Sequence, residues 1–257
     1  MAGKTITSLF SFMFFGLATI VNLPMSHASE SKNFCLETGV VKHLLIDVTS
    51  VYDDRAKHQI QDGFSKIISG LMGGEKVVIS TIENSFTASR TIYEGCVPHC
   101  DGATIVSNCT EGFLILEKRK QLSKLRNALA KNITQTIDLP NSDIFRTLYF
   151  STKEQQKDPT KLVLIIFSDM IENSDFISGN EFFSSVESSL MAKLSKDDLL
   201  PNFMGADIVV FGIGRGGTTG REPLKPNRLS RVRKHWGSYF KMTGAKNVEI
   251  SESYIPN

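Results

Sequence analysis

The 257-residue sequence has almost no excess of charge of either sign, with 29 Lys and Arg residues against 27 Asp and Glu residues. So small a net charge gives no sign of a nucleic-acid partner, which needs a basic surface or stripe. After residue 28 the chain also lacks an apolar run long enough for a transmembrane helix, which takes roughly 20 residues. It contains no internal repeat and no low-complexity tract. These absences favour a folded domain that neither binds nucleic acid nor spans a membrane after residue 28.

The first 28 residues have the pattern of a secretory signal peptide. Lys4 supplies a positive charge at the start, residues 9–21 form a short apolar core, and Ser26-His27-Ala28 offers small residues at the positions that signal peptidase reads. The apolar core is too short to span a bilayer comfortably, so we favour cleavage after Ala28 over an uncleaved anchor. The sequence therefore predicts a periplasmic or secreted protein, divided into a signal peptide (1–28), an N-terminal extension (29–39) and one domain (40–257).

All four cysteines lie beyond the signal peptide, at Cys35, Cys96, Cys100 and Cys109. An even number of cysteines in an oxidising compartment predicts disulfide bonds, and four cysteines allow three connectivities. We favour Cys96–Cys100 within one loop and Cys35–Cys109 across it. The alternative is a zinc site made by Cys96, His99, Cys100 and Cys109. Sulfur and nitrogen ligands suit tetrahedral zinc, but this spacing matches no common zinc module.

Strand-like and helix-like segments alternate along most of the chain. This alternation predicts a three-layer, doubly wound α/β fold, with a mostly parallel sheet covered by helices on both faces. The expected strands span about 40–48, 76–82, 86–93, 161–167, 206–214 and 248–250. The first and the central one are apolar almost throughout, as strands buried on both faces are, whereas 86–93 alternates weakly and is expected at or near a sheet edge. The expected helices have apolar residues at helical spacing. The first carries Ile60 to Leu71, the second begins near Phe113 and carries Leu122 to Ile133, and the third runs from Asp143 to about Phe150. The fourth starts at Ser178, which forms a capping box with Glu181, and reaches Leu194, and the last runs from Pro226 to about Gly244. Residues 94–112 form a loop excursion that carries three of the cysteines.

Two of the expected strands end in aspartate and hydroxyl side chains. Asp47 and Thr49 follow the first strand, and Ser168-Asp169 ends the central one. The carboxyl ends of parallel strands meet at one edge of a sheet, where ligands bind. Ser142 and Asp143, which open a helix, are expected at the same edge. We therefore predict one shared polar site, for binding and not for catalysis.

Oxygen ligands of this kind suit a hard divalent cation such as Mg²⁺ or Mn²⁺. The site would leave one coordination position open for a carboxylate from a partner protein. The plainer alternative is that these residues only cap helices and turns, and Ser142 is well placed as an N-cap.

The order of elements and the segment Asp47-Val48-Thr49-Ser50-Val51 resemble the von Willebrand factor type A (integrin I-like) domain, in its exported bacterial single-domain branch, with its D-x-S/T-x-S pattern. The resemblance covers about residues 40–250 and continues in Asp169, in Phe211-Gly212-Ile213-Gly214 and in residues 233–245. It implies a metal-ion-dependent adhesion site, with metal ligands at Asp47, Thr49, Ser142 or Asp143, and Asp169.

Two departures from the family pattern affect the metal site. Val51 stands where the pattern has its second serine, and its side chain has no oxygen to give a metal. Met170 follows Asp169 where the family often has a glycine. The resemblance thus implies a degenerate metal site, which lacks the oxygen ligand of the second serine and the glycine after the later aspartate.

We predict an exported protein-binding module, not an enzyme, whose partner is another protein. The resemblance adds that such short exported domains can belong to envelope, conjugation or secretion assemblies. One alternative is a metal-dependent phosphohydrolase with Asp47 as nucleophile, but Thr49 stands where haloacid-dehalogenase-like enzymes carry their second acid, and no G-x-S-x-G occurs. The other alternative is a purely structural assembly component with a vestigial site.

Overall fold

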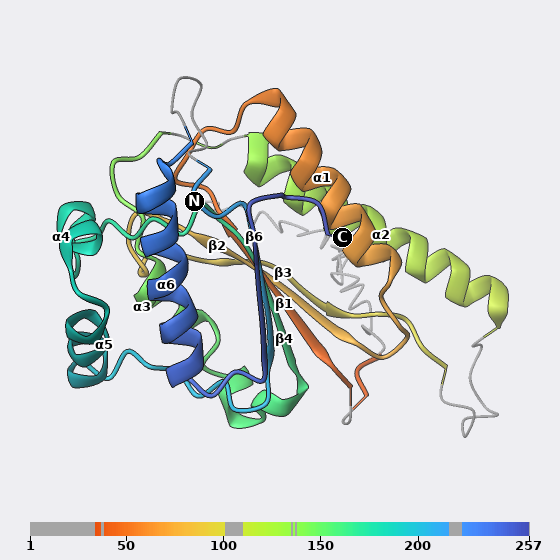
Figure 1. Ribbon diagram of the computed structural model, residues 1–257. Helices are drawn as coiled ribbons and strands as arrows, with labels where there is room; N and C mark the ends of the chain where they lie inside the picture. The colour runs from red at the N-terminus through yellow and green to blue at the C-terminus, as the bar shows by residue number, and fades with distance from the viewer. Residues whose placement is uncertain are drawn as a thin grey trace, which may run out of the picture. The chain divides into compact units, whose positions relative to one another are not determined.

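The computed structural model describes residues 34–36, 39–100, 110–134, 136, 138–215 and 223–256. The strands of this part of the chain form one six-stranded sheet with the order β3-β2-β1-β4-β5-β6 (Figure 1). All neighbouring pairs are parallel except β2 and β3, which are antiparallel. The strands are β1 (Val41–Asp47), β2 (Lys76–Ile82), β3 (Thr91–Cys96), β4 (Leu162–Phe167), β5 (Asp207–Phe211) and β6 (Asn247–Ser251).

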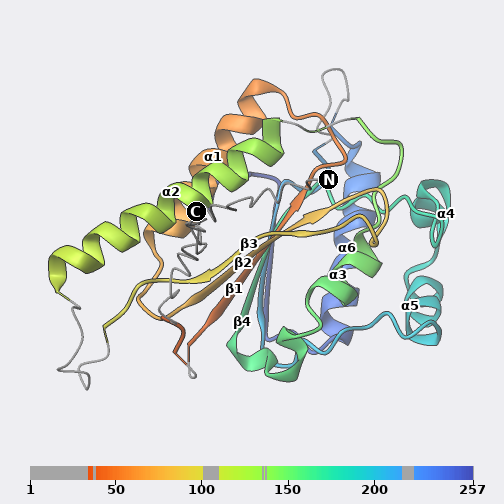
Figure 2. The same ribbon diagram turned by 180° about the vertical axis from the view of Figure 1, so that it is seen from behind.

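Helices cover both faces of the sheet, as the sequence predicts. Figures 1 and 2 show α1 (Asp54–Ser69) and α2 (Glu111–Thr134) on one face, with α3 (Ile144–Ser151) and α6 (Pro226–Met242) on the other. The short helices α4 (Gly179–Ser184) and α5 (Glu187–Lys196) lie beside α6. Side chains of β1 alternate between the two resulting cores, since Leu45 packs on the α3–α6 side and Leu44 and Ile46 on the α1–α2 side. The three-layer α/β prediction is confirmed.

The strand order reverses between β1 and β4. From β1 the chain proceeds outward to β2 and β3, and then returns to place β4 on the other side of β1, followed by β5 and β6. In open α/β sheets, ligands bind outside the carboxyl ends of the strands at such a switch point. The fold therefore places the ends of β1 and β4, where Asp47 and Asp169 lie, at the position most suited to a binding site.

The predicted strands other than the third are confirmed to within three residues, and the predicted helices are present, with one of them divided into two. The third strand covers Thr91–Cys96 and not 86–93, so Phe86 lies in the preceding turn. Ser178 caps a helix as predicted, accepting a hydrogen bond from the backbone N–H of Glu181, but this helix ends at Ser184 and a second begins at Glu187. The hydroxyl of Ser185 donates to the carbonyl oxygen of Glu181 at 2.6 Å. Serine hydroxyls that compete in this way for backbone groups favour helix ends over helix interiors.

The disulfide pairing differs from the prediction. Cys35 is bonded to Cys96, with 5.1 Å between their Cα atoms, and Cys100 is also disulfide-bonded. The predicted pairs Cys96–Cys100 and Cys35–Cys109 are therefore wrong, although Cys109 itself lies outside the described residues. Cys96 and Cys100 are oxidised and cannot be the thiolate ligands of the alternative zinc site.

Backbone hydrogen bonds to one glycine explain why Cys35 meets Cys96. Leu36 donates its N–H to the carbonyl oxygen of Gly74 at 3.2 Å, and Gly74 donates its N–H to the carbonyl oxygen of Val97 at 2.9 Å. Cys35 and Cys96 are the chain neighbours of Leu36 and Val97, so the two thiols come together where β3 ends. Sequence spacing gave no sign of this, because the bridging glycine lies in the turn before β2.

The described residues contain no helix with the length and apolarity needed to cross a membrane. The expected signal peptide at residues 1–28 lies outside the part of the chain that the structure describes.

Candidate functional site

Asp47 is the centre of a buried cluster of hydroxyl groups at the end of β1. Only 2 % of the residue is exposed to solvent. Its Oδ1 accepts hydrogen bonds from the backbone N–H of Thr49 at 3.0 Å and from Thr49 Oγ1 at 2.7 Å. Its Oδ2 accepts from Ser168 Oγ at 2.7 Å and from Ser142 Oγ at 3.4 Å. The structure thus brings together three segments that the sequence predicted to converge.

The register of the central strands puts Ser168, and not Asp169, level with Asp47. Ile46 of β1 pairs with Phe167 of β4, so the next residue on each strand faces its neighbour. Asp169 lies one position further along, where its Oδ1 accepts from the backbone N–H of Ile171 at 2.9 Å and its carbonyl oxygen accepts from Gly214 N at 2.8 Å. Two aspartates therefore emerge from adjacent strand ends. The hydrogen bond from Ser168 to Asp47 is a contact that sequence reasoning missed.

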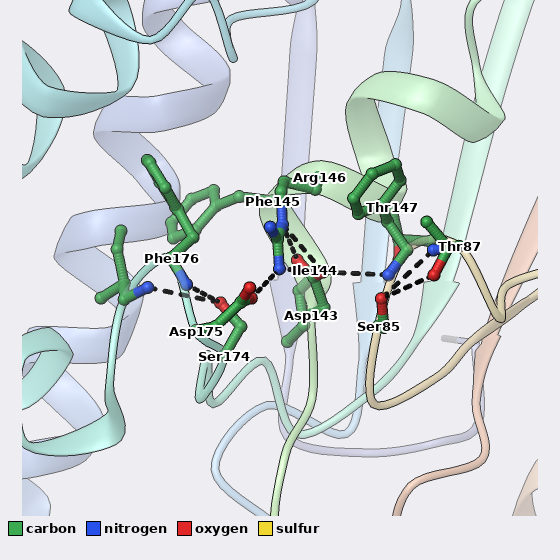
Figure 3. A network of polar contacts seen from close by, with 12 residues as sticks. Ser85, Thr87, Asp143, Ile144, Phe145, Arg146, Thr147, Ser174, Asp175 and Phe176 are labelled. Atoms are coloured by element: carbon green, nitrogen blue, oxygen red, sulfur yellow. Dashed lines mark hydrogen bonds and ion pairs between the residues drawn. The ribbon is translucent and has the colours of Figure 1, made fainter.

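Asp143 turns away from this cluster. Its carboxylate accepts from Arg146 Nε at 2.9 and 3.0 Å, and its Oδ2 also accepts from the backbone N–H of Phe86 at 2.9 Å. Figure 3 shows Arg146 between Asp143 and Asp175, with which it also forms an ion pair. Of the two predicted middle-loop ligands, the structure therefore places Ser142 beside Asp47 and Asp143 in a separate ion-pair network.

Glu172 is a buried acid in the same region that sequence reasoning missed. Its Oε2 accepts from the backbone N–H groups of Ile144 and Phe145 at 2.8 and 3.1 Å, which are the first residues of α3. Complete burial raises the pKa of Glu172 to about 8, against the opposing effect of its hydrogen bonds. Glu172 therefore holds the start of α3, and with it Ser142 and Asp143, in place.

Two tyrosines support the cluster from the side of α1. Tyr52 donates its hydroxyl to the carbonyl oxygen of Asp47 at 2.6 Å, and its ring meets that of Tyr254 edge-on with 6.0 Å between centroids. Gly212 has a φ of +91°, and a Cβ there would lie 2.1 Å from the ring of Tyr254. The strand-end glycine thus allows the C-terminal segment to pack against the cluster.

Asp47 is a buried carboxylate without a cationic side chain beside it. No Lys or Arg of the described residues forms an ion pair with it. Burial raises the pKa of Asp47 above its ordinary value, and the hydrogen bonds from Ser168, Thr49 and Ser142 counteract only part of this rise. A buried carboxylate is stabilised by hydrogen bonds, by a proton or by a metal ion.

The oxygen atoms around Asp47 fit a hard divalent cation in chemical type. Thr49, Ser142 and Ser168 supply hydroxyls, and Asp47 and Asp169 supply carboxylates. Val51 supplies none, and the carboxylate of Asp143 is bound to Arg146. Within the described ranges no three His, Cys, Asp or Glu residues are clustered closely enough to hold a metal by themselves. Any cation here would therefore depend on the hydroxyls.

No protein-family profile and no curated protein matches this sequence. Among solved structures, the chain is similar to a von Willebrand factor type A protein from Catenulispora acidiphila, with 12% identity and a TM-score of 0.39 over 80% of this chain and 42% of that one. It is similar to proximal thread matrix protein 1 from the mussel byssus, with 10% identity and a TM-score of 0.41 over 86% of this chain and 45% of that one. It is also similar to a pilus adhesin, SpaC, from Lactobacillus rhamnosus GG, with 11% identity and a TM-score of 0.43 over 86% of this chain and 29% of that one.

This chain spans less than half the length of each of these three solved chains. Identities and TM-scores this low carry no function from one protein to another. The sheet order and the layers described above agree with the fold that the sequence resemblance implies.

Proposed function

We propose that this chain is an exported protein-binding module whose partner meets the rim formed by the ends of β1 and β4. The observation that carries the proposal is Asp47, a buried carboxylate surrounded by hydroxyls at the switch point of the sheet and not paired with a cation among the described residues. A binding rim at this position agrees with where open α/β sheets bind their ligands. The disulfides support an exported protein, since such bonds persist in oxidising compartments.

A divalent cation is the second part of the proposal. Asp47, Thr49, Ser142 and Asp169 would hold Mg²⁺ or Mn²⁺, and Asp47 also orients the neighbouring hydroxyls. When bound, the ion would supply a positive centre with an open position for a carboxylate of the partner. The protein's own part is to hold the hydroxyls, which Asp47 does through the contacts to Thr49 and Ser142.

Restoring the missing hydroxyl should strengthen cation binding. Val51→Ser adds one oxygen at the position that the family pattern gives to a metal ligand. We expect the variant to bind Mn²⁺ at least about tenfold more tightly than the natural protein, equivalent to about 1.4 kcal/mol. Isothermal titration calorimetry of the purified protein with Mn²⁺, and then with Mg²⁺, measures the difference.

Val51→Ala is the matched control, because it also removes the valine side chain but adds no oxygen. We expect it to bind the cations no better than the natural protein does. The double variant Val51→Ser/Asp47→Asn should lose the gain, since Asp47 orients the neighbouring hydroxyl of Thr49. Absence of Mn²⁺ binding by both the natural protein and Val51→Ser would contradict the cation part of the proposal.

The resemblance alone suggests a place in an envelope, conjugation or secretion assembly, and we include it in the proposal as the setting in which the partner is found. The phosphohydrolase alternative gains nothing from the contacts of Asp47. A nucleophilic carboxylate needs an oxygen directed at substrate, whereas both oxygens of Asp47 accept hydrogen bonds from the protein.

A further inference from the structure

A cleft of about 350 Å³ lies beside the rim. It is bounded by the start of α1, residues 213–215 after β5, residues 223–224 before α6, the start of α6 and the C-terminal segment after β6. Figure 1 shows this last segment crossing from β6 back toward α1. The cleft has room for about a dozen water molecules at roughly 30 Å³ each. The side chains that matter for its chemistry are Asp53, Arg55, Arg215, Leu224, Glu252 and Tyr254.

Two arginines in the cleft have no acidic partner in the described part of the chain. Arg55 forms no ion pair there, and the guanidinium of Arg215 donates to the amide oxygen of Gln59 at 3.3 Å. The two acids in the wall are engaged elsewhere. Glu252 forms an ion pair with Arg233 at 2.7 Å, and Asp53 accepts a hydrogen bond from Ala56 N at 2.6 Å as the N-cap of α1. Asp53 keeps its negative charge, so the described lining residues that form no ion pair have an excess of one positive charge.

Tyr254 provides a second, independent sign of a ligand. Only 1 % of the residue is exposed, yet its hydroxyl has no hydrogen-bond partner among the described residues. Burial, together with the negative charges of Asp169 and Asp47, raises the pKa of Tyr254, so the hydroxyl remains a donor. A buried donor without an acceptor costs about 1–3 kcal/mol. An oxygen atom of a ligand that reaches this hydroxyl would supply that acceptor.

We propose that this cleft binds the carboxylate side chain of an acidic segment of the partner protein. The inference rests on the proposed function in one respect, namely that a protein partner meets this rim. Arginine presents a planar fork of donors that matches a carboxylate in a bidentate way. Leu224 and Leu229 in the wall offer an apolar surface for the aliphatic stem of a glutamate. The guanidinium groups of Arg55 and Arg215 and the hydroxyl of Tyr254 would be the donors to a carboxylate in this cleft.

The test uses the purified protein and a fluorescein-labelled peptide of alternating Glu and Gly residues, with binding followed by fluorescence anisotropy. We expect the Arg55→Gln/Arg215→Gln double variant to bind at least about tenfold more weakly than the natural protein. Arg119→Gln, which removes an equal charge from the exposed face of α2, should leave binding unchanged. Binding should weaken steeply with added salt, because the charges at the mouth are screened.

Two comparison ligands separate a protein carboxylate from other anions. A peptide with Gln in place of Glu should not bind, and inorganic phosphate should compete only at concentrations far above that of the peptide. Equal binding by the double variant and the natural protein would overturn the inference, as would phosphate competing as well as the peptide. Neither result bears on the metal site, which calorimetry with Mn²⁺ and Val51→Ser tests without any peptide, so the two failures are distinguishable.

Tyr254→Phe should move affinity and stability in opposite directions. Removing the hydroxyl takes away a buried donor that has no partner in the described structure, so the free protein should become more stable, with a higher melting temperature. The same change should weaken binding of the acidic peptide several-fold, because the ligand loses a hydrogen bond. Differential scanning fluorimetry and anisotropy measure the two effects. A variant that binds the peptide as the natural protein does would show that Tyr254 has a packing role only and would remove it from the proposed site.

Discussion

Replacing Trp236 by alanine is expected to lower the free energy of unfolding by about 3–5 kcal/mol, the range for buried aromatic residues. Trp236 is fully buried in α6. Its ring stacks on Phe145 of α3 with 4.3 Å between centroids, and it meets Tyr239 edge-on at 5.3 Å. The substitution leaves a large cavity between two helices and the sheet. Chemical denaturation followed by circular dichroism measures the loss.

Trp236 also holds the loop that follows Asp169. Its indole N–H donates to the carbonyl oxygen of Met170 at 2.7 Å, and Met170 has a φ of +60°, an uncommon conformation for a residue other than glycine. Trp236→Phe keeps most of the apolar contact but leaves this carbonyl without its donor. We expect it to cost about 1–3 kcal/mol, less than the alanine variant. Cation affinity in a Val51→Ser background should fall with it, because the loop bearing Asp169 loses a support.

Met242→Ala provides the matched control for Trp236→Ala in the same helix. Met242 is 49 % exposed, so its truncation should change stability by no more than about 0.5 kcal/mol. A loss below about 1 kcal/mol in Trp236→Ala would contradict the packing described here. It would mean that the interface between α3 and α6 contributes little to the stability of the fold.

The strands and most helices could be predicted from the sequence because burial on both faces leaves a local pattern. The run Leu162–Phe167 is apolar throughout, and it lies in the centre of the sheet. The spacing of Ile60, Phe64 and Ile68 likewise marks the buried face of α1. The nearness of the strand ends that carry Asp47 and Asp169 followed from topology alone, since the carboxyl ends of parallel strands share one edge.

The features that sequence reasoning missed depend on contacts between distant residues. The pairing of Cys35 with Cys96 follows from backbone hydrogen bonds to Gly74, which no spacing rule reveals. The separation of Ser142 from Asp143 follows from Arg146, one turn further along α3, which takes the aspartate as its ion-pair partner. An arginine three residues after an aspartate at a helix start was a usable signal for this ion pair.

Glu172 shows most clearly why part of the site lay beyond the sequence. It stands in a loop three residues after Asp169, where an acid is ordinarily solvated, yet it is fully buried beneath the start of α3. Burial raises its pKa from the ordinary 4.5 to about 8, with a further contribution from the charge of Asp143. Between these two values the folded protein holds one more proton than the unfolded chain does.

The contribution of Glu172 to the stability of the protein should therefore fall as the pH rises from 4.5 to about 8. A group that binds a proton more tightly in the folded state stabilises that state fully below its unfolded pKa, and this contribution is lost as the pH approaches the folded pKa, at about 1.4 kcal/mol per pH unit at most. Glu172→Gln keeps the shape of the side chain and an oxygen for the N–H groups of Ile144 and Phe145, but it does not titrate. In this variant the decline should disappear.

Free energies of unfolding at about pH 5, 7 and 9 for both proteins test this, since their difference isolates the one carboxyl group from all others. We expect Glu172→Gln to gain about 2–4 kcal/mol on the natural protein between the lowest and the highest pH. Glu249→Gln, an exposed glutamate of β6, should follow the natural protein throughout. If the difference between Glu172→Gln and the natural protein does not change with pH, Glu172 is ionised in the folded state. Its hydrogen bonds to Ser174 and to the start of α3 would then outweigh the effect of burial.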